Sequence, residues 1–175
     1  MKKLYSADSI RNRIKEMARQ LNDTYGNAEC VHMVVVMNGA FMLAADLVRY
    51  LKMPLILHFV GGSYFEGAIK HEIGLQANAM PENFKGAPVI LLEDIVDSGK
   101  SLMELQALLA TRHVGSTKIV TLLKRQSTEH APDMYGFTIP DNMFVVGYGL
   151  DLDGKYRELE DLYLLASAPS MSGVC

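Results

Sequence analysis

Short apolar runs that alternate with helical patterns limit this chain to a small group of folds. The runs cover residues 31–37, 55–60, 87–92, 119–123 and 143–148. Continuous apolar runs of this length are typical of strands buried in a parallel sheet. Apolar residues recur at helical spacing over 6–25, 41–51 and 98–113. The alternation predicts an α/β fold with a mostly parallel central sheet flanked by helices.

A segment in the middle of the chain predicts a flap beside this sheet. Residues 72–77 alternate apolar and polar, which indicates a half-exposed strand. A polar, glycine-containing stretch over 63–70 separates residues 72–77 from the apolar run 55–60. We expect the two strands and the stretch between them to form a mobile two-stranded flap.

The composition excludes several classes of protein. A chain of 175 residues, 49% hydrophobic and 21% charged, is expected to form one domain over 1–175. The net charge of −3 predicts no nucleic-acid partner, and the absence of a long apolar run predicts no membrane partner. Cys30 and Cys175 lie far apart. A disulfide framework is therefore not expected, and we predict a cytoplasmic location.

The run VILLEDIVDSGKS, residues 89–101, carries most of the chemistry. Ligands of parallel sheets bind at the carboxyl ends of the strands, where this run is expected to lie. Gly99 lets backbone amides approach an anion, and the start of the following helix favours a phosphate. The adjacent acids Glu93 and Asp94 suit a ribose diol or hydrated Mg²⁺. The sequence is not a P-loop, because that motif needs a glycine at position 94.

A purely structural interpretation of the same run remains open. Ser101 and Glu104 have the spacing of a helix capping box, and a carboxylate such as Asp97 is favoured at a helix start. Any one of these residues is explained by capping alone. Three acids, a glycine and two serines within thirteen positions favour a ligand site.

The run resembles the phosphoribosyl diphosphate (PRPP) binding motif of type I phosphoribosyltransferases. That motif has four apolar residues, two acids, two apolar residues, Asp, Ser or Thr, Gly, Lys or Gly, and Ser or Thr. Lys124-Arg125, the segment 144–151 and Tyr156-Arg157 resemble base- and diphosphate-binding segments of the hypoxanthine-guanine phosphoribosyltransferase family. The resemblance covers roughly residues 5–165. It implies a type I phosphoribosyltransferase fold, with a small hood from the terminal segments beside the sheet and flap.

The resemblance also implies an activity, namely transfer of the phosphoribosyl group of PRPP to hypoxanthine or guanine with release of diphosphate. It assigns ribose and Mg²⁺ contacts to Glu93 and Asp94, and a second Mg²⁺ contact to Asp151. Asp97 matches the acid that accepts a proton from the purine. The residues that match the 5′-phosphate cradle are Ser98, Gly99, Lys100 and Ser101.

The remaining roles implied by the resemblance concern the purine and the diphosphate. Lys124 matches a donor to the six-position oxygen of the purine, and Phe144 matches an aromatic that stacks on the base. Val145 matches a residue that binds the base through its backbone, and Asp151 also belongs to this purine-binding set. Without the family, Lys124 would be a solvated lysine and Phe144 a core residue. Arg157 matches a diphosphate contact, for which its fixed donors are suited.

Two loops complete the set of expected site residues. Asn38 and Gly39 match a diphosphate-binding loop that often contains a cis non-proline peptide, although the family commonly has Lys where this chain has Asn38. Ser63 and Tyr64 match the start of the mobile loop that closes over the site. The segment that follows, residues 65–68, departs from the usual polar pattern.

Two other functions remain open at this stage. One is a PRPP-sensing regulator of the same fold, which the purine-site residues and the net charge of −3 disfavour. The other is an enzyme for another base, such as a xanthine-preferring phosphoribosyltransferase. The family forms homodimers and homotetramers, so we expect one of these assemblies, with the helix after Gly39 as a candidate interface.

Overall fold

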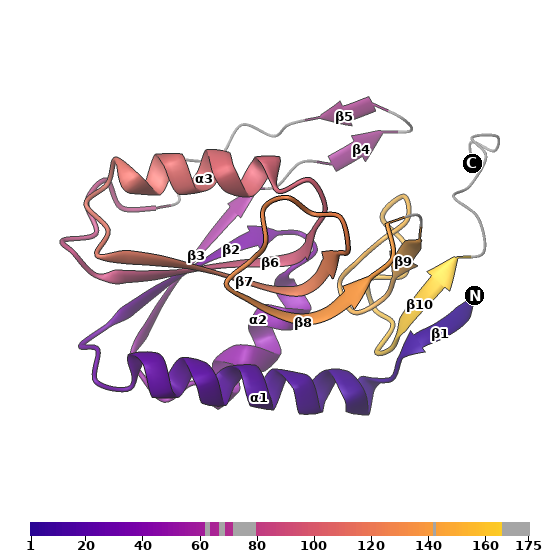
Figure 1. Ribbon diagram of the computed structural model, residues 1–175, viewed down its shortest axis with the longest axis horizontal. Coiled ribbons are helices and arrows are strands. Elements are labelled where there is room, and N and C mark those ends of the chain that lie inside the picture. The colour runs from indigo at the N-terminus through magenta and orange to yellow at the C-terminus, as the bar shows by residue number, and fades with distance from the viewer. Residues whose placement is uncertain (62–63, 67–68, 72–79, 142, 166–175) are drawn as a thin grey trace.

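The computed structural model describes residues 1–61, 64–66, 69–71, 80–141 and 143–165. A central five-stranded sheet has the order β3-β2-β6-β7-β8, and all its neighbouring strands are parallel. Helices α1 and α2 cover one face and α3 covers the other (Figure 1). The strands are β2 Val31–Met37, β3 Leu55–Gly61, β6 Pro88–Val96, β7 Ser116–Arg125 and β8 Met134–Ile139. The expected α/β architecture is confirmed.

One strand predicted for this sheet lies elsewhere, and one strand of the sheet was not predicted. The run 143–148 was expected to be one of its buried strands, but β9, Phe144–Val146, lies in a separate sheet. The fifth strand of the central sheet is instead β8, which the sequence did not reveal. Its outer position explains why, because a strand at the sheet edge need not be continuously apolar: Tyr135 is exposed and Gly136 interrupts the apolar pattern.

The helices begin where the local sequence favours it. Helix α1, Ala7–Tyr25, is capped by Ser6, whose hydroxyl accepts a hydrogen bond from the Ser9 amide at 3.2 Å. Helix α2, Phe41–Leu47, continues into the 3₁₀ turn η1, Val48–Tyr50. Helix α3 spans Lys100–Ala110, and its N-cap is Gly99 at φ +76°. Ser101 therefore lies inside the helix, so the capping-box alternative does not describe this N-terminus.

Two apolar layers hold the sheet between the helices. The first contains residues of α1, α2 and the hood, and includes Ile14, Leu43 and Val145. The second lies under α3 and includes Val34, Leu91 and Leu105. Because successive residues of a strand face opposite sides, membership of these two layers shows which way each strand residue points.

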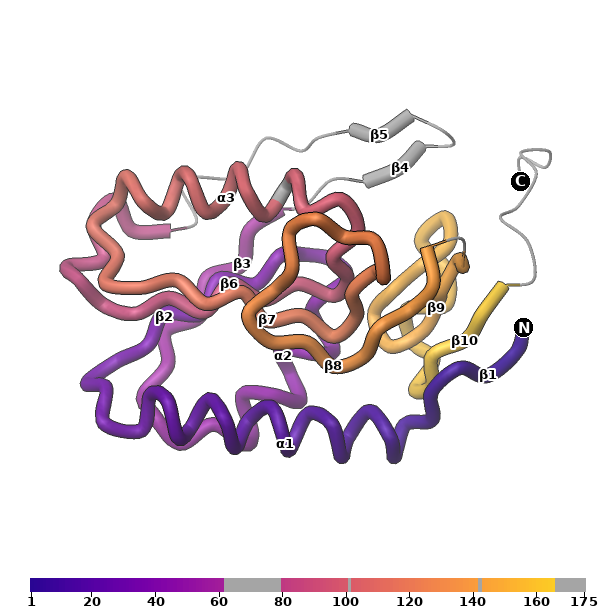
Figure 2. The backbone as a smooth tube through the Cα atoms, viewed as in Figure 1, coloured from indigo at the N-terminus to yellow at the C-terminus, as the bar shows by residue number. Residues whose placement is uncertain are grey.

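The two ends of the chain form the expected hood. Strands β1, Lys2–Tyr5, and β10, Leu162–Leu165, pair antiparallel, and β9 pairs with β10. Figure 2 shows the N- and C-terminal strands side by side at one end of the molecule. The carboxylate of Asp161 fastens this sheet to α1, since it accepts from the Ala7 amide at 2.7 Å and pairs with Lys3 at 2.6 Å.

The flap has two antiparallel strands, as expected, but they are not the predicted ones. Strands β4, Tyr64–Glu66, and β5, Ile69–His71, pair with each other. The run 55–60, predicted as a flap strand, forms the edge of the central sheet as β3, because its backbone pairs with β2. The predicted strand 72–77 lies outside the described residues.

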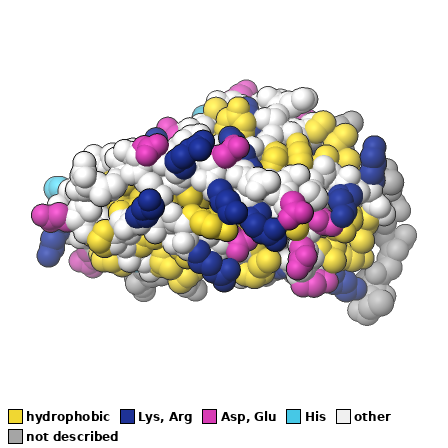
Figure 3. All heavy atoms as spheres, turned by 90° about the horizontal axis from the view of Figure 1, so that it is seen from below, with side chains coloured by type: hydrophobic (Ala, Val, Ile, Leu, Met, Phe, Trp, Pro, Cys, Tyr) yellow, Lys and Arg dark blue, Asp and Glu magenta, His cyan; other side chains and the backbone are white. Residues whose placement is uncertain are grey.

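The surface around α1 carries charges of both signs. Arg11 pairs with Asp8 and Arg13 with Glu16, both one helical turn apart. Figure 3, which views this side of the molecule, shows basic and acidic side chains interspersed. Among the helices that the structure describes, none combines the length and apolar character needed to cross a membrane.

Candidate active site

The carboxyl ends of β2, β6 and β7 meet at the edge of the central sheet nearest the hood (Figure 1). The segments that follow these strands contain most of the predicted site residues. Strand β6 continues to Val96, so Glu93 and Asp94 lie within the strand rather than after it. The hydrogen-bonded sheet therefore holds the backbone of both acids, and only residues 97–99 form the connection to α3.

Gly39 packs directly against the carboxylate of Asp94. A Cβ atom at position 39 would lie 1.7 Å from the Asp94 Oδ2, so no larger residue fits without moving one of them. The expected cis peptide is present between Met37 and Asn38. On the other side, a Cβ at position 149 would lie 2.1 Å from the Gly39 carbonyl oxygen. Three segments distant in sequence are thus stacked: β6, the 38–40 loop and the segment after β9.

Arg157 and Asp151 complete this cluster. Arg157 Nη2 lies 2.7 Å from Asp151 Oδ1, and Nη1 donates to the Gly149 carbonyl at 2.7 Å. Both side chains remain partly exposed, which leaves room for a ligand to contact them. A carboxylate pair beside a guanidinium can hold a hydrated cation and an anionic phosphate together.

The carboxyl group of Asp94 has a perturbed acidity. Burial raises the pKa of Asp94 from 3.8 to about 6, and the neighbouring Asp151 carboxylate acts in the same direction. The Ile95 amide, which donates to Asp94 Oδ1 at 2.8 Å, and the Arg157 charge lower the pKa and only partly offset the burial. A carboxylate buried at such a cost is typical of functional sites.

The segment 97–101 lies at the start of α3. The Asp97 side chain is exposed, and its Oδ1 lies 3.4 Å from Arg125 Nε. Gly99 is buried under His130, because a Cβ at position 99 would lie 2.7 Å from the His130 Cβ. The Lys100 amide approaches the Ser98 hydroxyl at 3.4 Å. The first turn of α3 follows Asp97 directly, and its backbone amides have no helical partner, so they can form a phosphate cradle.

The predicted purine residues come from two parts of the fold. Phe144 is partly exposed at the start of β9, and Val145 is buried in the layer shared with α1. The ammonium of Lys124 lies 4.8 Å from the centre of the Tyr135 ring. It thus contacts β8, whereas Phe144 and Val145 belong to the hood.

Other predicted residues are placed only in part. Tyr64 begins β4, while Ser63 lies outside the described residues. Asn38 is exposed next to Gly39. Within the described part of the chain, no three His, Cys, Asp or Glu residues gather into a group able to hold a metal ion alone.

Sequence reasoning missed two contributors to this edge, Arg125 and Gly149. Arg125 drew notice only as the neighbour of Lys124, although its place at the end of a buried strand puts it at the ligand-binding edge of a parallel sheet. Gly149 lies in the segment 144–151 and had no signal of its own, because its role depends on contact with a residue 110 positions away.

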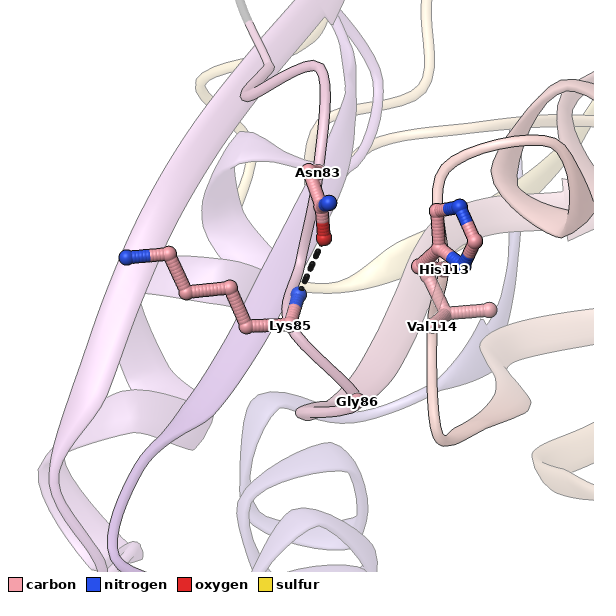
Figure 4. Close-up of a pocket in the computed structure, with 5 residues that line it drawn as sticks. All are labelled: Asn83, Lys85, Gly86, His113 and Val114. Atoms are coloured by element: carbon pink, nitrogen blue, oxygen red, sulfur yellow. Dashed lines mark hydrogen bonds between the residues drawn. The ribbon is translucent and has the colours of Figure 1, made fainter.

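A hollow at the opposite end of the sheet is separate from this site. It is lined by Asn83, Lys85, Gly86, His113 and Val114, which precede β6 and β7 (Figure 4). In this hollow the Lys85 amide donates a hydrogen bond to Asn83 Oδ1 at 2.7 Å. Ligands of parallel sheets bind at the carboxyl ends of strands, and this hollow lies at the amino ends.

Comparison with known proteins identifies similar chains. The family model of the phosphoribosyl transferase domain matches residues 2–153. The chain is 34% identical to a hypoxanthine-guanine phosphoribosyltransferase of Mycobacterium avium, covering 89% of this chain and 81% of the relative. It is also 34% identical to a hypoxanthine phosphoribosyltransferase of Haemophilus influenzae, covering 89% and 90%.

Solved structures give the same result. A mutant hypoxanthine phosphoribosyltransferase of Trypanosoma cruzi in a ternary complex with substrates matches with a TM-score of 0.81 and 34% identity, covering 94% of both chains. A hypoxanthine-guanine phosphoribosyltransferase of Bacillus anthracis matches with a TM-score of 0.78 and 30% identity, covering 93% of this chain and 96% of that one.

Replacing Asp94 by Asn is expected to stabilise the protein at pH 8. The folded-state pKa of about 6 exceeds the ordinary 3.8, so the cost of ionising Asp94 in the fold grows as the pH rises above 3.8 and is complete above pH 6. This cost to the free energy of unfolding disappears when the pH falls below the ordinary pKa of 3.8. The gain in free energy of unfolding at pH 8 is on the order of 2 kcal/mol and vanishes near pH 3.5. Urea unfolding at both pH values, without divalent ions, measures it.

The exposed Asp23→Asn substitution on α1 is the control, and it should change the free energy of unfolding by less than about 0.5 kcal/mol. An Asp94→Asn protein that is equally stable or less stable at pH 8 would contradict the burial cost.

Proposed function

The chain belongs to the phosphoribosyl transferase domain family, and from this premise we propose that it is a purine-salvage enzyme. It transfers the phosphoribosyl group of PRPP to hypoxanthine or guanine and yields IMP or GMP with diphosphate. The observation that carries the proposal is the assembly of Asp94, Gly39, Asp151 and Arg157 at one sheet edge, beside Asp97 and the start of α3. The names of the similar proteins support the same reaction.

The reaction exchanges one bond at the anomeric carbon of the ribose. The bond to a purine ring nitrogen forms, the bond to the diphosphate oxygen breaks, and the purine loses a proton. Positive charge develops on the ribose as diphosphate leaves. The Asp94 carboxylate beside the ribose stabilises that charge, and the Arg157 guanidinium stabilises the departing diphosphate.

Asp97 accepts the purine proton in this proposal. Its side chain is 77% exposed, so a base that binds over it can reach the carboxylate. The residues 98–101 bind the 5′-phosphate through the amides at the start of α3. Phe144 offers a partly exposed ring for stacking on the purine, and Val145 follows it with a buried side chain and backbone groups close to the base.

Mg²⁺ is the cofactor that these residues suit. Asp94 and Asp151 provide carboxylates, of which Asp151 is close enough to raise the pKa of Asp94, and Glu93 precedes Asp94 in β6. Mg²⁺ usually keeps water and binds one or two carboxylates together with substrate phosphates. The two acids and a diphosphate would hold the ion, which when bound would neutralise charge on the leaving group.

We also propose a cytoplasmic homo-oligomer. Within the described residues, Cys30 is a free cysteine, which suits a reducing compartment. Strand β3 at the sheet edge exposes Ile56 (46%), Leu57 (38%) and Phe59 (51%). Large apolar residues gathered on one edge strand favour a second copy as the partner.

Turnover on four bases tests the proposed activity and its nearest alternatives. With PRPP and Mg²⁺, hypoxanthine and guanine should give nucleotide at rates at least tenfold above xanthine and adenine. Adenine is disfavoured because a cation near the six-position of the purine favours a carbonyl over an amino group. Absorbance or radiolabel detection of nucleotide measures this. A preference for xanthine would indicate a xanthine-preferring phosphoribosyltransferase instead. No nucleotide from any base would favour a PRPP-sensing regulator.

Replacing Asp97 by Asn should remove the proton acceptor while the phosphate cradle remains. We expect kcat to fall by about 100-fold or more, with the affinity for PRPP changed by less than about threefold. Steady-state kinetics and calorimetric titration with PRPP separate the two quantities. Unchanged kcat would exclude Asp97 as the acceptor.

Substituting Phe59 by Ser should weaken the assembly. We expect the parent to be a dimer or tetramer and Phe59→Ser to shift toward monomer, because the substitution removes the most exposed apolar side chain of β3. Light scattering after size exclusion measures the mass. Met103→Ser on α3, which removes another exposed apolar side chain, is the matched control. A monomeric parent would contradict the proposal.

A further inference from the structure

Tyr148 is buried in the core, and its hydroxyl has no part in the proposed reaction. Only 5% of its surface is exposed, and it packs in the apolar layer shared with α1 and α2. A phenylalanine would fill the same space, so packing alone does not account for the hydroxyl. That hydroxyl donates a hydrogen bond to Asp46 Oδ2 at 2.5 Å, and it lies 3.5 Å from the Met42 carbonyl oxygen.

The backbone at Tyr148 has a conformation that a tyrosine rarely adopts. Its φ is +49°, and both neighbours, Gly147 and Gly149, also have positive φ. A bulky residue in this region is disfavoured and persists only where its surroundings hold it. Here the Tyr148 amide donates to the Leu159 carbonyl at 2.7 Å, and the side chain is held by burial and by Asp46. The hydrogen bond to Asp46 is therefore one of the contacts that keep this turn in place.

The acidity of the phenol makes it a lasting donor. Burial raises the pKa of Tyr148 well above its ordinary value of 10.0, and the hydrogen bond and charge of Asp46 act in the same direction. The phenol therefore stays protonated at neutral pH. Hydrogen bonds to a charged acceptor are roughly twice as strong as neutral ones. Asp46 also pairs with Arg49 at 3.4 Å, but the Arg49 side chain is 72% exposed, so this ion pair contributes little.

Two contacts fasten the segment after β9 to the helix that follows the 38–40 loop. Asp46 lies in the last turn of α2, and Gly39 precedes the helix. Tyr148 contacts Asp46, and Gly149 packs against the Gly39 carbonyl oxygen, which a Cβ at position 149 would meet at 2.1 Å. Because the two contacts lie at opposite ends of a short helix, they fix the orientation of the segment as well as its position.

The same segment carries the residues proposed to bind diphosphate and Mg²⁺. The Gly149 amide donates to the Arg157 carbonyl at 2.9 Å, and Arg157 Nη1 donates to the Gly149 carbonyl at 2.7 Å. Arg157 Nη2 pairs with Asp151 Oδ1 at 2.7 Å. A shift of Tyr148 would therefore move the guanidinium and the carboxylate relative to the 38–40 loop.

We propose that Tyr148 and Asp46 are positioning residues for the diphosphate site, an inference that rests on the proposed function. Their hydrogen bond holds Asp151 and Arg157 at the separation from Gly39 that PRPP and diphosphate require. Neither of the two touches the substrates in this role. Groups held in place before binding cost less to order when the ligand arrives, so loss of the bond weakens binding of both phosphorylated ligands.

Five variants of the full chain test this role: Tyr148→Phe, Asp46→Ala, Asp46→Asn, the double variant Tyr148→Phe/Asp46→Ala, and Tyr5→Phe. Tyr5→Phe is the matched control, because the Tyr5 hydroxyl also joins the hood to another element, the Thr138 carbonyl of β8 at 3.4 Å, but not to α2. Thermal unfolding checks that each variant folds. Calorimetric titration with diphosphate and Mg²⁺ measures binding without turnover, and kinetics gives kcat and the KM values for PRPP and hypoxanthine.

We expect Tyr148→Phe and Asp46→Ala each to weaken diphosphate binding, and to raise the KM for PRPP, by about 3- to 10-fold, as when part of one hydrogen bond is lost from binding. The KM for hypoxanthine should change by less than about twofold, because pairing with β10 holds β9 independently. The double variant should lose no more than the larger single effect, since both substitutions remove the same bond. Asp46→Asn, which retains an acceptor, and Tyr5→Phe should stay within about twofold of the parent.

Three results would overturn the proposal: parent-like diphosphate binding in Tyr148→Phe, an equal rise of both KM values, or losses that multiply in the double variant. If Tyr148→Phe does not fold, Asp46→Ala decides, because the Asp46 side chain is partly exposed on α2. Parent-like diphosphate binding in Asp46→Ala would then overturn it. A parent protein that binds diphosphate but forms no nucleotide from any purine would instead refute the proposed function itself.

Discussion

The contact between the Gly39 backbone and the Asp94 carboxylate is the constraint on which the rest of the site depends. A Cβ at position 39 would meet the carboxylate at 1.7 Å, and one at position 149 would meet the Gly39 carbonyl at 2.1 Å. Backbone and carboxylate can approach this closely only where side chains are missing. The stack holds the end of β2, the middle of β6 and the segment after β9 in fixed relation, so the acids and Arg157 have defined positions before any ligand binds.

The stack has an energetic cost as well as a geometric role. Packing the 38–40 loop onto Asp94 removes its carboxylate from water, which raises the pKa of Asp94 to about 6. A core selected for stability alone would not keep an acid there. The cost is understandable if the carboxylate is needed ionised when a cation or a developing positive charge lies beside it.

The sequence predicted the parts of this structure whose signals are local. Strand 31–37, the first helix and the acids of residues 93–97 follow from an apolar run, helical spacing of apolar residues and motif spacing. Strand β8 was missed because it is not continuously apolar, and the strand at 143–148 was assigned to the wrong sheet because a short apolar run does not show which sheet it joins. The surroundings of Lys124 and Arg125 were likewise not predictable, because their contacts with Tyr135 and Asp97 depend on tertiary packing.

A crystal structure of the chain with IMP, diphosphate and Mg²⁺ tests the central claim most directly, namely that one edge of the sheet gathers all parts of the reaction. The account predicts the 5′-phosphate on the amides of residues 98–101, the diphosphate between Gly39 and Arg157, and the purine on Phe144 beside Asp97. A nucleotide bound elsewhere, or a purine that points away from Phe144 and Asp97, would contradict it.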